Sequence, residues 1–258
     1  MHDAHNHLHC FSDAASRLQD SREPDRKHMV ASLRPDDWPA LASLHAQFPN
    51  RILPAFGIHP WFAQSLPPDW VDSLRRMLLA HPVAAVGECG IDRLRSPLEP
   101  AQQTELLDTI FQLAGEHCRG IVLHVVRAWD LAAPILERHA GRSPVLLHAF
   151  SPRGLQGQPW TRWNAWFSFR TESLAHPSAP LAELIRSLPA DRLLIESDAH
   201  PANPSDENCL EQVNTRLRTS LSSLASLLGN TPEEIEARTD ANFALWCAAC
   251  RELSPDSE

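Results

Sequence analysis

The sequence lacks any apolar run that approaches the roughly 20 residues a helix needs to cross a bilayer. Its first residues carry neither the basic segment nor the apolar stretch of a secretory signal peptide. Its six cysteines are scattered and do not resemble a disulfide framework. These absences predict a cytoplasmic protein in a reducing setting, without membrane contact.

Positive charge is also scarce. Lysine and arginine number 23 against 32 aspartates and glutamates, which gives a formal net charge of −9. This balance argues against nonspecific adhesion to nucleic acid or anionic membranes, but it leaves room for a local positive pocket. Repeats and low-complexity segments are absent, and the 22 prolines are spread over many turns without marking a linker. A chain of 258 residues then predicts one domain, 1–258, and no stable protein partner is evident.

Short apolar runs alternate with segments of helical spacing along the whole chain. Val213 to Leu228, for example, carries the apolar stripe of a long closing helix. Several of the runs are continuously apolar, which is typical of a parallel sheet buried on both faces. We expect eight strands, at 1–8, 28–33, 51–58, 82–88, 120–125, 144–150, 165–169 and 192–195. Eight strands alternating with helices predict an α/β fold, the (β/α)8 TIM barrel.

Six polar side chains fall at or near the ends of five of these strands: His5, His7, Glu88, His124, His148 and Asp198. His5 and His7 share one face of their strand because they are two residues apart. A doubly wound open sheet, the alternative fold, would place its ligand at a single crevice, whereas these candidates come from five strands. Imidazole and carboxylate donors suit Zn, Mn or Mg. The six exceed what one tetrahedral ion uses, so two divalent ions bridged by Glu88 are expected.

The chain resembles the TatD family of metal-dependent hydrolases over nearly its whole length. The family patterns D-x-H-x-H-L, G-x-H-P, G-E-x-G-L-D, L-H, H-x-F-[ST] and L-x-E-[ST]-D have counterparts in the same order. They lie at 3–8 (DAHNHL), 57–60 (GIHP), 87–92 (GECGID), 123–124 (LH), 148–151 (HAFS) and 194–198 (LIESD). A terminal N-x-x-x-[LF] pattern is similar to 242–246 (NFALW), and 102–113 (QQTELLDTIFQL) loosely resembles a Q-x-x-x-F-x-x-Q-L helix.

The resemblance implies a TIM-barrel hydrolase with two ions. One ion is expected on His5, His7 and Asp198, the other on His124 and His148, with Glu88 contacting both. Asp198 and Glu88 are the expected catalytic residues, and Asp198 would orient or deprotonate the attacking water. The resemblance also implies that His59 touches substrate. Since members of this family are mostly described as deoxyribonucleases, it implies hydrolysis of phosphodiesters, with single-stranded DNA ends as the anionic substrate.

Several positions depart from the family pattern. His9 follows Leu8 where the family has Asp, and Ala199-His200-Pro201 stands in place of S/A-P-Y. The basic G-x-R-N-x-P stretch is replaced by the acidic segment 203–208 (NPSDEN), which removes an expected phosphate contact. Arginines nevertheless follow several strand ends and favour an anionic substrate. Those expected to bind it are Arg93, Arg127 and Arg153, while Arg95 and Arg170 are placed similarly.

Three tryptophans, Trp160, Trp163 and Trp166, could stack bases. Because side chains alternate along a strand, the aromatic residues of 160–169 cannot all face the mouth of the barrel, so we expect them to pack in the core. We also expect helix packing for Cys247 and Cys250. Two other functions compete with the phosphodiesterase. The same barrel and ions could hydrolyse an amide, ester or lactone, or the chain could be a noncatalytic scaffold; the intact donor set argues against the scaffold.

Overall fold

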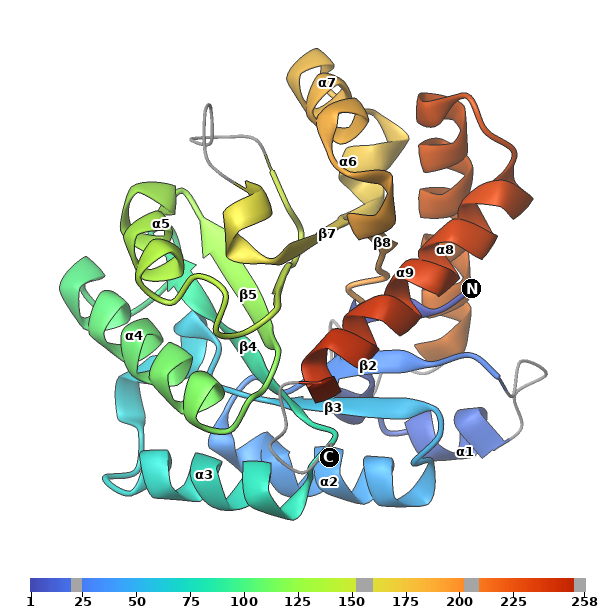
Figure 1. The fold of residues 1–258 in the computed structure, drawn as a ribbon. Helices are drawn as coiled ribbons and strands as arrows, with labels where there is room; N and C mark the ends of the chain where they lie inside the picture. The colour runs from blue at the N-terminus through green and yellow to red at the C-terminus, as the bar shows by residue number, and fades with distance from the viewer. Residues whose placement is uncertain (20–24, 152–159, 202–208, 253–258) are drawn as a thin grey trace.

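The computed structural model describes residues 1–19, 25–151, 160–201 and 209–252. Eight parallel strands form one sheet in which each strand pairs with the next along the chain (Figure 1). The strands are β1 Asp3–Asn6, β2 His28–Ala31, β3 Ile52–Phe56, β4 Ala85–Asp92, β5 Ile121–Val126, β6 Val145–Leu147, β7 Ala165–Phe169 and β8 Leu193–Ile195. The predicted (β/α)8 barrel is confirmed, and each of the eight predicted strands has a counterpart, although several of their bounds differ.

Helices surround the sheet and connect its strands (Figure 1). The α-helices are α1 Ala14–Gln19, α2 Trp38–Gln47, α3 Trp70–Ala80, α4 Pro100–Glu116, α5 Trp129–Arg138, α6 Thr171–Ala175, α7 Ala179–Ser187, α8 Cys209–Leu228 and α9 Pro232–Glu252. The 3-10 helices are η1 Leu8–Cys10, η2 Pro35–Asp37, η3 Pro60–Ser65, η4 Trp160–Trp163 and η5 Ala190–Arg192. In the described part of the chain, no helix combines the length and apolar character needed to cross a membrane.

The barrel closes where the segment after β8 meets β1. The backbone N–H of Asp198 donates to the carbonyl of His5 at 3.0 Å, and that of His7 donates to Ala199 at 2.9 Å. The buried carboxylate of Asp3 adds two bonds, accepting from the backbone N–H of Ser197 at 2.9 Å and from its hydroxyl at 2.6 Å. This seam therefore fixes three of the predicted ligands, His5, His7 and Asp198, relative to one another.

The lower interior of the barrel is apolar and is covered by α9. Phe243, Trp246 and Cys250 of this helix pack against side chains from all eight strands, namely Ala4, Met29, Ala31, Leu53, Ala55, Ala85, Val122, Leu146, Trp166 and Leu194. Cys247 is partly buried against the same cluster. Helix packing is therefore confirmed for both cysteines, and none of the six cysteines forms a disulfide. The polar site is left to the opposite, carboxyl-terminal end.

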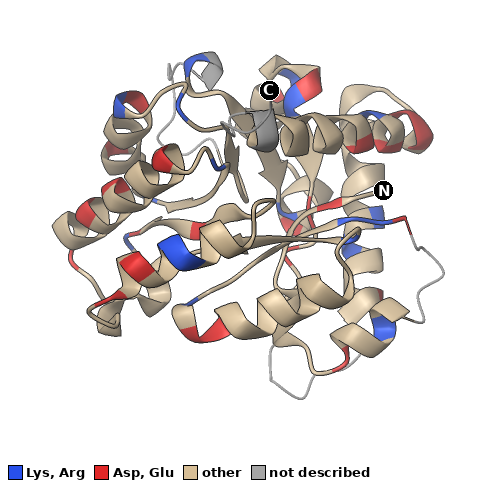
Figure 2. Ribbon diagram, turned by 60° about the horizontal axis from the view of Figure 1, so that its bottom comes forward, with Lys and Arg blue, Asp and Glu red and all other residues tan. Residues whose placement is uncertain are grey.

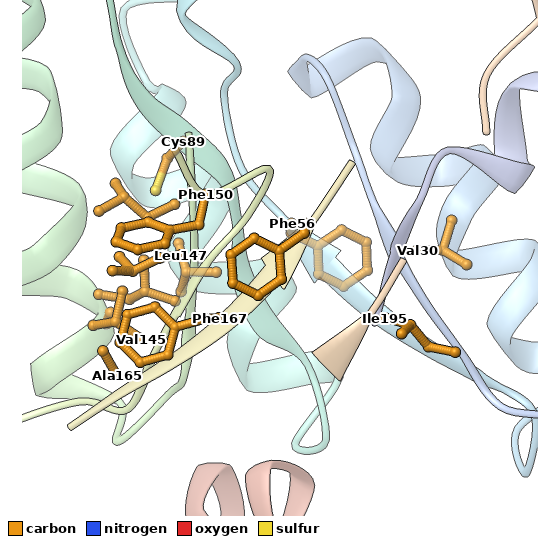
Figure 3. Close-up of a cluster of buried hydrophobic side chains, with 14 of the residues drawn as sticks. Val30, Phe56, Cys89, Val145, Leu147, Phe150, Ala165, Phe167 and Ile195 are labelled. Carbon is orange, nitrogen blue, oxygen red and sulfur yellow. The ribbon is translucent and has the colours of Figure 1, made fainter. Parts of the chain in front are cut away.

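Strand β7 alternates as the sequence predicts. Phe167 and Phe169 belong to the layer between the barrel and its helices. Phe150 packs there against Phe167, with their ring centroids 4.9 Å apart (Figure 3). Trp166 points the other way, into the lower interior. Trp166 and Trp163 are 3% and 1% exposed, so their core packing is confirmed.

A bulge in β4 changes which way Glu88 faces. Val86 and Cys89 are three residues apart in β4, whereas the residues of β5 that pair with them are only two residues apart. Strand β4 therefore contains one extra residue. Ala85 faces the barrel interior and Val86 the helices. Without the extra residue, alternation would turn Glu88 toward the helices as well. The prediction that this strand ends at Glu88 was wrong, because β4 continues past the bulge to Asp92.

Candidate metal centre

A cavity of about 1300 Å³ opens at the carboxyl ends of the strands. Five of the six predicted metal ligands line it, namely His7, Glu88, His124, His148 and Asp198. The sixth, His5, is completely buried and contacts Glu88. Residues far apart in the sequence are therefore brought into one cluster, as the strand-end pattern predicts. The acidic segment 203–208 lies outside the described residues.

Glu88 is at the centre of this cluster, and its two carboxylate oxygens face different neighbours. Oε2 lies 3.1 Å from His5 Nε2 and 3.4 Å from His7 Nε2. Oε1 lies 2.8 Å from His124 Nδ1 and 3.7 Å from His148 Nε2. Since the two oxygens face different imidazoles, one carboxylate could contact two ions.

The backbone around Glu88 is packed so closely that two neighbouring positions must be glycine. A side chain on Gly57 would collide with the backbone of Gly87 and Glu88, and one on Gly90 would collide with the carbonyl of His124. Ser32 secures this arrangement, because its carbonyl accepts the N–H of Glu88 at 3.1 Å. Close packing therefore explains Gly57 of the G-x-H-P pattern and Gly90, the second glycine of the G-E-x-G pattern.

Asp198 completes the half of the cluster that contains His5 and His7. Its Oδ1 lies 3.8 Å from His5 Nε2 and 3.9 Å from His7 Nε2. On the other side, Oδ2 lies 3.9 Å from Arg170 Nε. The residue has a φ of +46°, in the left-handed region that aspartate and asparagine tolerate better than most residues. Its backbone conformation directs the carboxylate into the cavity.

Hydrogen bonds on the far side of three imidazoles determine which nitrogen is free. His7 Nδ1 donates to the carbonyl of Ala31 at 2.8 Å, and His148 Nδ1 donates to Glu196 Oε2 at 2.8 Å. When these rings are neutral, each Nε2 carries the lone pair and faces Glu88. His124 has the opposite orientation, with Nε2 3.4 Å from Asp92 and Nδ1 toward Glu88. Such outer partners are typical of histidines that bind metal ions.

His59 has a different hydrogen-bond pattern. Its Nδ1 accepts the backbone N–H of Trp61 at 3.1 Å, so the proton of the neutral ring is on Nε2. That Nε2–H points at Glu88 Oε1, 3.2 Å away. Burial lowers the pKa of His59 to about 4, which keeps the ring neutral. His59 is therefore oriented as a hydrogen-bond donor, although its position alone would also allow it to bind an ion with Glu88 and His124.

The carboxylates of the cluster attract positive charge. Burial alone would raise the pKa of Glu88, but the imidazoles of His59, His5 and His148 hold it well below its usual range. Burial lowers the pKa of His148, but the carboxylates of Glu196 and Glu88 outweigh burial and raise it to about 10. The buried centre therefore favours bound positive charge, whether a proton or a cation.

The donor set fits divalent ions. Three overlapping groups hold their ligand atoms within 4.8 Å of one another: His5, Glu88 and His148; His5, His7 and Asp198; and His59, Glu88 and His124. Both ring nitrogens of His5 are buried and form no hydrogen bond of good geometry within the described residues, although Nε2 lies 3.1 Å from Glu88 Oε2. Leaving such a group unsatisfied costs about 1–3 kcal/mol, a cost that a coordinated cation at Nε2 would remove.

The arginines expected to bind substrate are placed differently. Arg127 lines the cavity, whereas Arg153 lies outside the described residues. Arg93 is not part of the lining, because its two terminal nitrogens donate to Asp130 at 2.7 and 2.6 Å. The sequence did not reveal that this guanidinium already has a carboxylate partner.

Two further arginines past the strand ends, Arg95 and Arg170, also line the cavity with Arg127. Figure 2 shows residues of both charge signs distributed over the surrounding helices. The positive side chains at the cavity therefore lie on a protein that is acidic as a whole.

Sequence reasoning did not assign a role to two carboxylates that orient the cluster. Glu196 is completely buried and accepts from His148 Nδ1, from the hydroxyl of Ser168 at 2.5 Å and from the backbone N–H of Ala149 at 3.1 Å. Asp92 faces His124. Both carboxylates lie in sequence motifs that resemble those of the family. They could therefore have been identified from their fixed spacing to a predicted ligand.

Comparison with known proteins adds the family. The model of the family described as TatD related DNase matches residues 2–247. The chain belongs to the TatD-related DNase family. A metal-dependent hydrolase TatD of Mycobacterium tuberculosis, itself described as uncharacterized, is 28% identical over 203 residues, 76% of each chain. A protein of Erwinia billingiae named 3'-5' ssDNA/RNA exonuclease TatD is 28% identical over 214 residues, 78% of this chain and 79% of that one. This member of the family is therefore a metal-dependent hydrolase.

Solved structures support the fold. The TatD homologue YjjV of Escherichia coli K12 superposes with a TM-score of 0.78 at 23% identity, covering 95% of this chain and 97% of that one. An N-acetyl-D-glucosamine-6-phosphate deacetylase of Mycobacterium smegmatis superposes with a TM-score of 0.54 at 15% identity, covering 95% and 75%. At these identities the likeness shows the barrel fold and leaves the substrate open.

Proposed function

We propose that this protein hydrolyses phosphodiester bonds at the 3' ends of single-stranded DNA or RNA. The observation that carries the proposal is the complete donor set around Glu88 in a chain whose family model covers residues 2–247. The names of relatives such as the Erwinia billingiae protein support the substrate class. The arginines that line the cavity, Arg95, Arg127 and Arg170, support an anionic substrate.

Two divalent ions would be held by this cluster, with Glu88 contributing to both. His5, His7 and Asp198 would hold one ion. His124 and His148 would hold the other. When bound, such ions lower the pKa of a water molecule and neutralise charge on a phosphate. Zn, Mn and Mg all suit this mixture of imidazole and carboxylate donors.

The chain's own residues then have distinct tasks. Asp198, at the cavity wall, would orient the attacking water and accept its proton at a carboxylate oxygen. His59 would donate from Nε2 to a phosphate oxygen, which agrees with the tautomer set by the backbone of Trp61. Arg127 and Arg170 would bind the phosphate charge at the cavity wall.

Metal removal tests this function directly. Purified protein should cleave both single-stranded DNA and bis-p-nitrophenyl phosphate, EDTA should abolish cleavage, and Mg, Mn or Zn should restore it. The reason is that activation of the water depends on the bound ions. Product release would be measured by gel and by absorbance. Cleavage of the small diester alone would exclude DNA as the substrate. Cleavage of neither would contradict the proposal and favour amide or ester hydrolysis.

Glu196→Gln should weaken metal binding about 10- to 100-fold without unfolding the protein. The glutamine has a single carbonyl oxygen, so it cannot accept from both His148 and the backbone of Ala149 as the carboxylate does. Metal affinity would be measured by calorimetric titration. Ser168→Ala is the matched control, because it removes one bond to Glu196 and leaves the bond to His148. Equal affinities for wild type and Glu196→Gln would show that this carboxylate does not orient His148.

A further inference from the structure

One wall of the cavity is apolar and exposed. Trp61 and Phe62 of η3 and Leu94, just after β4, line it. Phe62 is 37% exposed and Leu94 is 56% exposed. They are two of the four large hydrophobic side chains that are exposed in the described part of the chain. Exposed apolar side chains that share one cavity mark a binding surface more often than chance exposure does.

Trp61 is held in a fixed orientation on this wall. Its indole Nε1 donates to Asp92 Oδ2 at 2.5 Å. Its ring meets the ring of His59 edge-on, with centroids 4.8 Å apart, and lies 6.2 Å from the ring of His124. His59 and His124 both contact Glu88 Oε1. A flat aromatic ring is therefore fixed one side chain away from Glu88, the centre of the candidate metal site.

A guanidinium group covers one face of this ring. The Cζ of Arg95 lies 4.1 Å from the centroid of Trp61. Arg95 is exposed and, within the described residues, forms no ion pair, whereas the neighbouring Arg93 is bound by Asp130. The contact with the ring is weak enough, at about 0.5–1 kcal/mol for an exposed pair, for a ligand to displace it. Arg95 is therefore a cation available to a ligand anion, beside a face available to a planar ring.

Other tryptophans do not offer such a surface. Five of the remaining seven are at most 6% exposed: Trp38, Trp129, Trp163, Trp166 and Trp246. Trp70 is on α3 and is not part of the cavity lining. The side chain of Trp160 lies outside the described residues. Within the described part of the chain, Trp61 is the half-buried indole at the cavity.

We propose that Trp61 and Arg95 form a nucleobase subsite, an inference that rests on the proposed function. A base next to the scissile phosphate stacks on the face of Trp61 that Arg95 now covers. The displaced guanidinium binds the phosphate of the same nucleotide. Stacking on an aromatic ring tolerates every base, and the arginine reads only the phosphate charge. The subsite therefore accepts single strands of any sequence and excludes duplexes, whose bases are already stacked.

Equilibrium binding tests this subsite without requiring turnover. A 5'-fluorescein hexathymidylate, and versions with one abasic residue at each position, would be titrated into metal-loaded Asp198→Asn protein and followed by anisotropy. One abasic position should weaken binding about 10-fold or more. Trp61→Leu in the same background should weaken binding of the intact strand by a similar factor. In this variant the abasic residue should cause no further loss of affinity. Trp70→Leu is the matched control and should bind like its parent.

Arg95→Gln provides a second test. It should weaken the intact and the abasic strands equally, by about 10-fold, because it removes a contact to phosphate. An abasic penalty that persists in Trp61→Leu would overturn the subsite, and so would an absence of strand binding by the parent protein. If Trp61→Leu and the abasic residue weaken binding as expected but the wild-type protein never cleaves DNA, the subsite is retained. The proposed phosphodiesterase activity is then rejected instead.

Discussion

Asp198→Asn should keep the fold and lower turnover of bis-p-nitrophenyl phosphate at least 100-fold. An amide cannot accept the proton of the attacking water, and a positioned general base typically contributes about 10²–10⁴-fold to a rate. Asparagine is the right replacement because Asp198 has a φ of +46°, which asparagine adopts readily and alanine does not. Steady-state kinetics at saturating metal would separate lost proton transfer from weakened metal binding, and thermal unfolding would verify the fold.

Asp72→Asn is the matched control for this experiment. Asp72 is on α3, its side chain is 66% exposed, and its contacts are with the surface residue Arg75. The same chemical change there should leave the rate unaltered, because exposed ion pairs contribute little. Retention by Asp198→Asn of more than about a tenth of the wild-type rate at saturating metal would contradict the role of Asp198 as the base.

The order of strands and the residues of the cluster could be predicted because each depends on a local pattern. Continuous apolar runs at 120–125 and 144–150 mark strands buried on both faces, and a polar residue at the end of such a run stands out. The parallel barrel then brings all strand ends to one side. His124 and His148 thus come together although nothing in their spacing indicates it.

The orientation of Glu88 could not be predicted in the same way. Simple alternation cannot place a bulge, yet the extra residue between Val86 and Cys89 decides whether Glu88 faces the barrel or the helices. A similar shift occurs in β1, where Asp3 and Asn6 are three residues apart but the residues of β2 that pair with them are two apart. Bulges arise from the fit of two strands, which a single strand's sequence does not contain.

Partners supplied by other parts of the chain were also beyond local patterns. Arg93 resembles Arg127 in the sequence, since both follow a strand that ends at the cavity. Only the fold shows that Arg93 is paired with Asp130, whereas Arg127 lines the cavity wall. The histidine tautomers depend likewise on distant groups, such as Glu196 for His148. Contacts between segments 37 or 48 residues apart need the tertiary structure.

Glu88→Gln should lower metal occupancy at both ion positions at once. Its Oε2 faces His5 and His7, and its Oε1 faces His124 and His148, so neutralising one group weakens both sets. The glutamine would also present an N–H to one set, where a cation requires a lone pair. Elemental analysis after equilibration at fixed metal concentration should give two ions per wild-type chain and far fewer in the variant.

Thermal unfolding offers an independent measure of the same effect. An ion whose free concentration is 1,000 times its dissociation constant stabilises a folded protein by about 4 kcal/mol. Filling both positions should therefore raise the wild-type melting temperature strongly. Glu88→Gln should lose most of this metal-dependent rise, whereas Glu105→Gln, on the exposed side of α4, should retain it. Loss of one ion only would place Glu88 on a single ion, and two ions at full occupancy would refute the bridge altogether. Because both outcomes are read without substrate, they test the centre apart from any choice between DNA, RNA and other esters.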